Sequence, residues 1–323
     1  MAFLHAPAAM RPRAVPSGPA VLRQADICSV CCLGCPGWLF RCDGCTQSTK
    51  EITPMKIRSV KAVFFSPTGT TRRIAECIGR AAAAGEPQLT DLTLPQTRGQ
   101  KVLCAGDELL ILAVPVYRGR VPGLLRDWLD TMLLDGTPAV CVAVYGNRAY
   151  DDALLELKDL VSARGGVVVA CAAFVGEHSY SAADTPVAAG RPDAEDCRRA
   201  EEFGEQVGRL LSDCGSAAGA GGVAVPGNRP YIEMPGRSVP EFIGVDETCT
   251  ECGVCAAACP VEAIEMAGGP VMDMNLCIFC CACIRCCPEQ ARYMKEGVMK
   301  DLARRLADTC SARKEPEFFF ARG

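Results

Sequence analysis

The sequence predicts an α/β doubly wound domain with a five-stranded parallel sheet, followed by a small α+β domain built around cysteines. Between residues 56 and 214, continuous apolar runs alternate with segments of helical repeat, and between 242 and 297 the cysteines recur in two regular runs. Strands that are apolar at every position are buried on both faces, as in a parallel sheet covered by helices. Residues 215–241 are rich in Gly and Pro and are expected to form a linker, and 298–323 a C-terminal helix and a frayed tail.

Each element of the first domain has its own signal. Apolar runs predict strands at residues 59–66, 108–116, 138–146 and 166–176, with a weaker edge strand near 88–92. Ile74, Cys77, Ile78 and Ala81 follow the spacing i, i+3, i+4, i+7 of one helix face. Similar stripes predict helices near 124–132, 157–161 and 203–211. Five strands with intervening helices suit a doubly wound sheet.

The first strand runs directly into SPTGTTRRIA, residues 66–75. In a doubly wound sheet this turn lies at the carboxyl end of the strand, where ligands bind, and it opens a helix whose N–H groups favour an anion. Hydroxyl groups and a flexible glycine then predict a phosphate site made by Ser66, Thr68, Gly69, Thr70 and Thr71. The alternative is that these hydroxyls only cap the helix.

S-P-T-G-T-T after an apolar strand resembles the flavodoxin signature, and the resemblance covers about residues 56–213. It implies that the loop binds the phosphate of FMN and that the isoalloxazine lies between two later loops, 114–122 and 145–150. Tyr117 is the expected stacking residue, although both loop tyrosines could instead be packing residues. Arg118 and Arg120 either pair with the cysteine-rich domain or are solvated. The implied flavin contacts are Pro115, Val116, Tyr117, Arg118, Tyr145, Gly146, Asn147 and Arg148.

The cysteine-rich region contains CTECGVCAAACP, residues 249–260, and CIFCCACIRCCPE, residues 277–289. Both runs fit C-x2-C-x2-C-x3-C-P, the pattern of bacterial ferredoxins with two [4Fe-4S] clusters. This resemblance covers about residues 242–297 and implies that the fourth cysteine of each run binds the other cluster. One cluster would take Cys249, Cys252, Cys255 and Cys287, and the other Cys277, Cys280, Cys283 and Cys259. Cys281 and Cys286 are left over. The alternative is zinc bound by C-x2-C pairs, which would require longer spacers between the pairs than these runs have.

Residues 1–55 are rich first in Pro and then in Cys, and their interpretation stays open. Cys28, Cys31, Cys35, Cys42 and Cys45 could hold zinc or an iron-sulfur group, but their spacing fits no template. The segment could also be disordered. A rival hypothesis is that the natural protein starts at Met55 and that the upstream residues come from a misplaced start codon.

Composition narrows the class of protein. The 23 cysteines in 323 residues lie in dense clusters, which favours metal capture in a reducing cytoplasm over a disulfide framework. A net charge of −4 gives no electrostatic footprint for nucleic acid. We expect no membrane span, since no run of eighteen apolar residues occurs, and prolines interrupt any signal-peptide core, although a transit peptide stays open. His178 is expected to be a satisfied loop residue.

Together the two resemblances point to the flavodoxin–ferredoxin fusion proteins common in anaerobes. They imply an electron-transfer protein that passes electrons between FMN and two [4Fe-4S] clusters, with donor and acceptor proteins or small acceptors as partners and no catalytic residue assigned. One alternative is a flavin-dependent oxidoreductase that reduces a small acceptor such as a quinone. Another is a non-redox metal-binding or sensing protein. The oligomeric state is left open.

Overall fold

The structure is a computed structural model that describes residues 55–82, 85–99, 101–220, 222–234 and 241–321. The hypotheses about Cys28 to Cys45 therefore lie outside the described residues.

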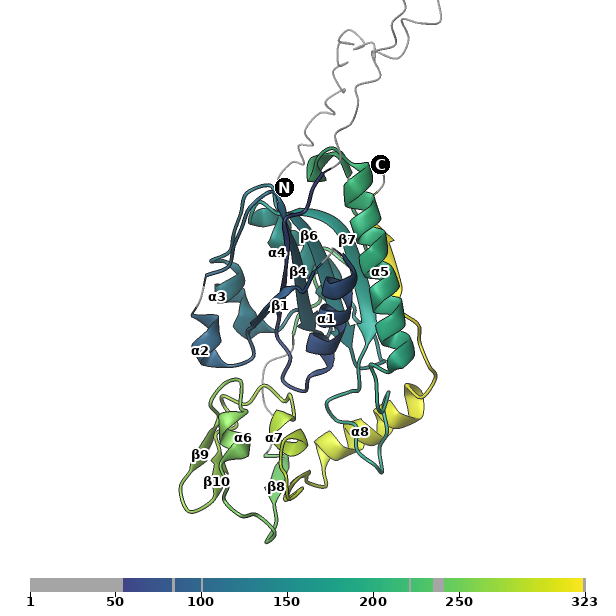
Figure 1. Cartoon of the computed structure of the whole chain (residues 1–323). Coiled ribbons are helices and arrows are strands. Elements are labelled where there is room, and N and C mark those ends of the chain that lie inside the picture. Colours follow the sequence, from purple (N-terminus) through teal and green to yellow (C-terminus); the bar gives the residue numbers. More distant parts are fainter. Residues whose placement is uncertain (1–54, 83–84, 100, 221, 235–240, 322–323) are drawn as a thin grey trace, which may run out of the picture. The chain divides into compact units, whose positions relative to one another are not determined.

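A doubly wound parallel sheet forms the first domain. Its strands are β1 (Ser59–Phe64), β2 (Gln88–Asp91), β4 (Glu108–Pro115), β6 (Pro138–Tyr145) and β7 (Val167–Val175). They pair in parallel in the order β2-β1-β4-β6-β7, the strand order of a flavodoxin-like sheet. Helices α1 (Thr70–Ala82) and α5 (Ala194–Asp213) pack together on one face, and α4 (Ala153–Ala163) packs against β6 and β7 (Figure 1). The predicted fold class is confirmed.

The central strands are buried along nearly their whole length, as their continuous apolar sequences predict. In β6 every residue is buried, and in β4 all but Pro115. The two helices on the first face approach closely at Gly204, where an added Cβ would lie 2.5 Å from the carbonyl oxygen of Ile78. A side chain at this position would force the helices apart, so the glycine sets their packing distance.

Shorter elements connect the strands. They are α2 (Pro95–Arg98), the paired β3 (Leu103–Cys104) and β5 (Leu133–Leu134), the 3-10 helices η1 (Gly123–Leu125) and η2 (Ala217–Ala220), and α3 (Arg126–Leu129). The long helix expected near 124–132 is thus wrong, because the chain makes only η1 and a single turn of α-helix there. Its apolar stripe is still buried at Leu125, Trp128, Leu129 and Met132.

The cysteine-rich part has its own small core and two short hairpin-like pairs. Strand β8 (Ile243–Val245) pairs with β11 (Arg292–Met294), and β9 (Ile264–Met266) pairs with β10 (Pro270–Met272). One-turn helices α6 (Val254–Ala257) and α7 (Ala282–Arg285) lie between them. Phe242, Ile243, Ile264 and Phe279 form its core together with buried cysteines.

The C-terminus returns to the first domain. After α8 (Val298–Thr309), strand β12 (Glu317–Phe320) pairs antiparallel with β7 and makes the sheet six-stranded. The expected frayed tail is therefore wrong: a run of three phenylalanines supplies backbone groups to the open edge of β7 and an apolar face. The ring of Phe318 packs 4.8 Å from that of Phe203 and 5.6 Å from that of Phe174, measured between centroids.

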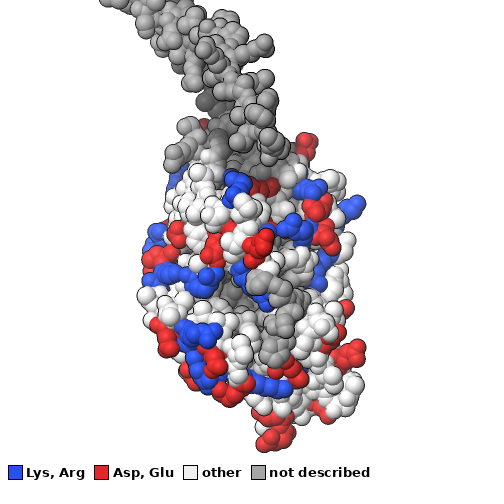
Figure 2. All heavy atoms as spheres, turned by 180° about the vertical axis from the view of Figure 1, so that it is seen from behind, with Lys and Arg blue, Asp and Glu red and all other residues white. Residues whose placement is uncertain are grey.

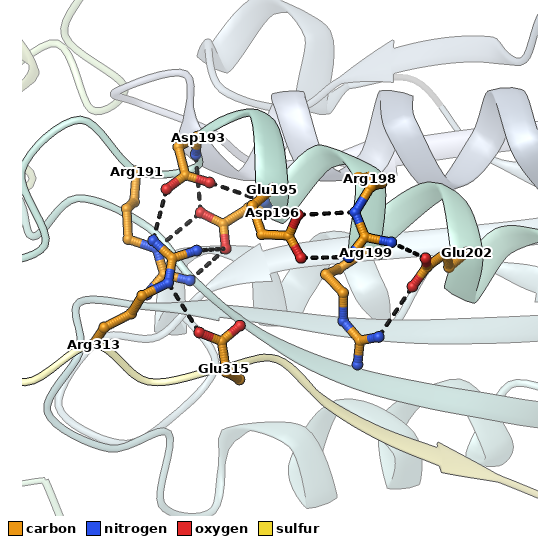
Figure 3. Close-up of polar contacts among 9 residues, drawn as sticks. All are labelled: Arg191, Asp193, Glu195, Asp196, Arg198, Arg199, Glu202, Arg313 and Glu315. Atoms are coloured by element: carbon orange, nitrogen blue, oxygen red, sulfur yellow. Dashed lines mark hydrogen bonds and ion pairs between the residues drawn. The ribbon is translucent and has the colours of Figure 1, made fainter.

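Ion pairs hold this returning segment against the start of α5 (Figure 3). Arg191 pairs with Asp196, whose side chain is fully buried, and donates to the carbonyl oxygen of Lys314 at 2.8 Å. Arg313 in turn contacts Asp193 at 2.7 Å. The Arg191–Asp196 pair is buried and therefore costly to break by removing one partner, and through Arg191 it holds the backbone at Lys314 in place.

The linker is also fastened to the first domain. The buried carboxylate of Asp152 accepts hydrogen bonds from the backbone N–H groups of Asn228 (2.7 Å) and Ile232 (2.6 Å). Burial alone would raise the pKa of Asp152, but these hydrogen bonds outweigh it and lower the pKa. Because the linker and β12 are both attached to the doubly wound domain, the cysteine-rich part is held from both of its ends.

Acidic and basic side chains are interspersed on the face that Figure 2 shows. Among the described residues, no helix combines the length and apolar character needed to cross a membrane.

Candidate functional site

A cavity lies at the carboxyl edge of the parallel sheet, where the loops after β1, β4, β6 and β7 converge. It is lined by Pro67, Thr68, Thr70, Thr71, Pro115, Val116, Tyr117, Val144, Tyr145, Gly146, Gly176, Glu177, His178, Ser179 and Cys280. We call it the sheet-edge cavity. It brings together the loop of residues 66–71, called the hydroxyl loop below, and the two later loops that the sequence singled out, 114–122 and 145–150. Ser66, Gly69, Arg118, Asn147 and Arg148, also predicted as contacts, are not among its lining residues.

Different residues of the hydroxyl loop fit the two roles considered for it, helix capping and phosphate binding. Ser66 caps α1, because its Oγ accepts the backbone N–H of Arg72 at 3.0 Å. Gly69 has a φ of 84° and turns the chain with a hydrogen bond from its N–H to the Ser66 carbonyl oxygen. The Oγ1 atom of Thr71 is buried and lacks a hydrogen-bond partner among the described residues. A buried hydroxyl at a helix N-terminus that lines a cavity fits an anionic group such as a phosphate.

Tyr117 and Tyr145 lie in different environments. A short turn, closed by backbone hydrogen bonds between Tyr117 and Arg120 of 3.0 and 3.1 Å, presents the Tyr117 ring. Burial raises the pKa of its phenol well above the usual value, and the neighbouring Cys280 raises it further. Tyr145 is only 4% exposed and packs edge-on against Tyr150. Tyr117 thus remains the predicted stacking residue, whereas Tyr145 contributes mainly to the core.

The loop after β6 has a structural role that its sequence did not indicate. The side chain of Asn147 donates to the carbonyl oxygens of Cys310 (2.7 Å) and Ala312 (2.8 Å), which follow α8. The carbonyl oxygen of Arg148 accepts a hydrogen bond from Lys314 at 2.6 Å. These two residues therefore hold the returning C-terminal segment beside the sheet-edge cavity.

His178 is a candidate site residue that sequence reasoning missed. Its ring lies against Gly146, where an added Cβ would come within 2.2 Å of it, and its Nδ1 accepts the N–H of Tyr180 at 3.0 Å. Burial, together with Arg148 and Arg285, lowers the pKa of His178 to about 4, so it is neutral at pH 7. The expectation that His178 is a hydrogen-bonded loop residue agrees with this bond to Tyr180. The only available signal for a site role was its position just after a strand.

The cysteines of the two runs surround two separate small cavities. One is lined by Cys249, Cys252, Cys255 and Cys287, and the other by Cys259, Cys277, Cys280 and Cys283. These are the two sets that the ferredoxin resemblance implies, with the fourth cysteine of each run crossing over. The assignment as ligands stays a prediction. No three His, Cys, Asp or Glu side chains among the described residues form a site for a single metal ion.

We call the first cavity the outer cysteine site and the second the inner cysteine site. At the outer site, Cys252 is exposed, and the buried Arg292 donates to the Cys255 sulfur at 3.5 Å. At the inner site, all four cysteines are buried, and burial raises the pKa of Cys280 to about 12. Such a pocket favours neutral thiols unless a positively charged metal centre stabilises the thiolates.

The two left-over cysteines also lie beside these sites. Cys281 is 2% exposed and lines the inner site, with its Sγ 3.9 Å from the Phe279 carbonyl oxygen. The Sγ of Cys286 lies 3.8 Å from the carbonyl oxygen of Cys283. Sequence spacing excluded both from the ligand pattern but could not show that Cys281 faces the cavity.

Cys280 connects the two halves of the protein. It lines both the inner cysteine site and the sheet-edge cavity. The contact is held by polar interactions: Arg285 pairs with Glu177 at 2.9 Å, and Arg98 donates to the Pro260 carbonyl oxygen at 2.6 Å. The guanidinium of Arg118 lies over the Phe279 ring, 5.6 Å from its centroid, so one of the two arginines in this loop does pair with the cysteine-rich part.

Known families and structures resemble the two parts separately. The family described as 4Fe-4S binding domain matches residues 244–265, which include the first cysteine run. A flavodoxin from Streptococcus pneumonia TIGR4 aligns at 18% identity over 46% of this chain and 97% of its own, with a TM-score of 0.33. Flavodoxin 1 from Bacillus cereus aligns at 18% identity over 48% and 99%, with a TM-score of 0.34. The NADH:FMN oxidoreductase EMOB in its apo form aligns at 19% over 48% and 90%, with a TM-score of 0.33. No curated protein matches the chain.

The strand order and the family match define the class of protein. The chain carries a flavodoxin-like α/β domain followed by a 4Fe-4S binding domain, consistent with a flavodoxin–ferredoxin fusion. The two parts together support a redox role.

Proposed function

We propose that the protein transfers electrons between an FMN, whose phosphate would lie in the sheet-edge cavity, and two [4Fe-4S] clusters, one at each cysteine site. The observation that carries this proposal is the position of Cys280, which lines both the sheet-edge cavity and the inner cysteine site. A cluster ligand in the wall of the flavin site would leave little distance for an electron to cross.

The residues around the sheet-edge cavity suit the phosphate end of FMN. The hydroxyl groups of Thr68, Thr70 and Thr71 and the N-terminus of α1 would hold the phosphate, since they offer donors and the positive end of a helix dipole. Tyr117 and the backbone at Gly146 would contact the isoalloxazine. The ring system would extend into an adjoining cavity of about 970 Å³ that Tyr117, Arg118 and Arg148 line. A bound flavin supplies one-electron and two-electron chemistry, whereas each cluster carries one electron.

The two cluster sites differ in burial, and this difference predicts the order in which electrons would pass through them. The inner site is buried against the flavodoxin-like domain, and the outer site has an exposed cysteine, Cys252. Electrons would therefore be exchanged with an external donor or acceptor protein at the outer site and pass through the inner site to the flavin. The Arg292 guanidinium beside Cys255 would stabilise negative charge on the outer cluster.

Cofactor content tests the proposal directly. Anaerobically purified protein should contain roughly eight irons, as two cubanes require, with matching acid-labile sulfide and about one FMN per chain. Iron and sulfide are measured chemically and the flavin by its released absorbance. Zinc in place of iron, with no flavin, would contradict electron transfer and favour the binding or sensing alternative.

Thr71→Val should separate flavin binding from stability. Its buried hydroxyl has no hydrogen-bond partner among the residues that the structure describes, so its removal should raise the free energy of unfolding of flavin-free protein by about 1 kcal/mol. The same change should weaken FMN binding about tenfold, because a hydrogen bond to a charged phosphate is lost. Denaturant unfolding and flavin titration measure the two effects.

Thr137→Val is the matched control. Thr137 is equally buried, but its hydroxyl donates to the Cys104 carbonyl oxygen at 2.7 Å, away from the cavity. This variant should lose stability and keep its FMN affinity. Unchanged FMN binding in Thr71→Val would show that this hydroxyl does not face the phosphate.

A further inference from the structure

The outer cysteine site contains a buried arginine that has no counter-ion. Arg292 is 3% exposed and lines this site, where its guanidinium donates to the Cys255 sulfur at 3.5 Å. Its Nε has no hydrogen-bond partner among the described residues, and no ion pair of that part of the chain includes it. A buried charge without a partner is costly. Arg292 therefore fits a site that carries negative charge when it is occupied.

The inner cysteine site has no such group. Apart from cysteines, its wall consists of the apolar side chains of Ile243, Pro260, Val261, Met272, Ile278 and Ala282. At the outer site the other charged wall residues are Glu251 and Glu289, and both are exposed, so their charges are screened by water and salt. The buried charge of Arg292 is screened much less. The walls of the two sites thus differ by one weakly screened positive charge.

We propose that Arg292 gives the outer cysteine site the higher reduction potential of the two, so that the first electron delivered to the cysteine-rich part rests there. The inference rests on the proposed electron-transfer function and adds the order in which the two sites fill. A positive charge and a hydrogen bond to a ligand sulfur both favour the more negative, reduced state of an iron-sulfur centre. Exposure of Cys252 to water acts in the same direction.

Filling the outer site takes one electron from the external donor protein, which is oxidised by one electron, and no bond forms or breaks. Passage of that electron to the inner site is then uphill in free energy. Arg292 would thus make the outer site the place where one electron is held before transfer to the flavin, which can take two.

The order of the two potentials can be measured without changing Arg292. A redox titration of the unmodified protein with its full iron and FMN content, followed by low-temperature electron paramagnetic resonance, gives a midpoint potential for each cluster. The signal of the outer cluster is the one altered in Cys287→Ser, because Cys287 lines the outer site. We expect this cluster to be reduced at the higher potential. A higher potential for the inner cluster would overturn the inference.

Arg292→Gln removes the charge and keeps an amide donor. It should lower the midpoint potential of the outer cluster by about 59 mV, which is about a tenfold fall in the ratio of reduced to oxidised centre at a fixed potential. Arg292→Lys keeps the charge and should recover most of this shift. The inner cluster should shift less. Burial raises the pKa of Cys283 there to about 12 and Arg292 opposes this rise, so its field reaches the inner site, but it lines only the outer one.

Lys295→Gln is the matched control, because it removes the same charge from the segment that follows β11. Lys295 is exposed, pairs with Glu241 at 2.9 Å and lines neither cysteine site. This variant should keep both midpoint potentials. A shift equal to that of Arg292→Gln would show that any nearby positive charge has the same effect and would contradict the special role of Arg292.

Two further results would overturn the inference. One is an unchanged outer potential in Arg292→Gln, and the other is an equal shift or equal loss of iron in Arg292→Gln and Arg292→Lys, which would assign the effect to packing and not to charge. Loss of iron from Arg292→Gln alone would support a counter-ion role. Purified protein without iron-sulfur clusters would instead refute the proposed electron-transfer function, so the two failures are distinguishable.

Discussion

Cys287→Ser should damage the cluster whose other three predicted ligands all lie more than thirty residues earlier in the chain. Cys287 lines the outer cysteine site together with Cys249, Cys252 and Cys255. Loss of its thiolate leaves three sulfurs around that cluster. Iron should fall from roughly eight to between about four and seven per chain, depending on whether the cluster is lost or keeps three irons.

Cys281→Ser and Cys286→Ser are the matched controls, and both should keep the full iron content. Neither fits the ligand spacing, although Cys281 lines the inner site and Cys286 precedes a predicted ligand. Low-temperature electron paramagnetic resonance of the reduced proteins should show two interacting clusters in these variants. Cys287→Ser should show an altered or three-iron species.

The neighbouring thiol introduces one further test. Cys286 could replace Cys287 as a ligand, because the two are adjacent in sequence. If this exchange occurs, the double variant Cys286→Ser with Cys287→Ser should lose more iron than Cys287→Ser alone. If Cys286→Ser loses a cluster and Cys287→Ser does not, the register of the second run is wrong by one residue.

Thr68→Asp should abolish FMN retention during purification while leaving the iron content unchanged. Thr68 lines the sheet-edge cavity in the loop that would hold the phosphate dianion. A carboxylate there repels the phosphate and competes for its donors. Repulsion between unit charges about 4 Å apart is about 4 kcal/mol at an effective dielectric of about 20, so affinity should fall by about a hundredfold or more.

Thr68→Asn isolates the charge, because its side chain has the shape of aspartate without the negative charge. It should bind FMN far more tightly than Thr68→Asp, and flavin titration of apo-protein compares the two. High salt should partly restore binding to Thr68→Asp, since screening weakens the repulsion. Equal FMN retention in both variants would place the phosphate elsewhere.

The local sequence by itself determined the buried strands, the loop after β1 and the grouping of the cysteines. Continuous apolar runs are sufficient for buried parallel strands, and β4, β6 and β7 lie where those runs predict them. The loop at residues 66–71 could be placed after β1 because the strand, the turn and the helix are contiguous within residues 59–82. The spacing of the cysteine runs likewise sorts them into two sets, and each set lines one cavity.

Tertiary structure decided which distant segments meet. The phenylalanines of β12 look like a frayed end in sequence, and they form a strand only because β7 offers an unpaired edge beside them. Asn147 and His178 acquire their roles from the returning C-terminal segment and from Gly146. The position of Cys280 in the wall of the sheet-edge cavity depends on how two separate cores pack. No periodicity encodes such packing, because it arises from side chains that are far apart in the chain and complementary only once both parts have folded.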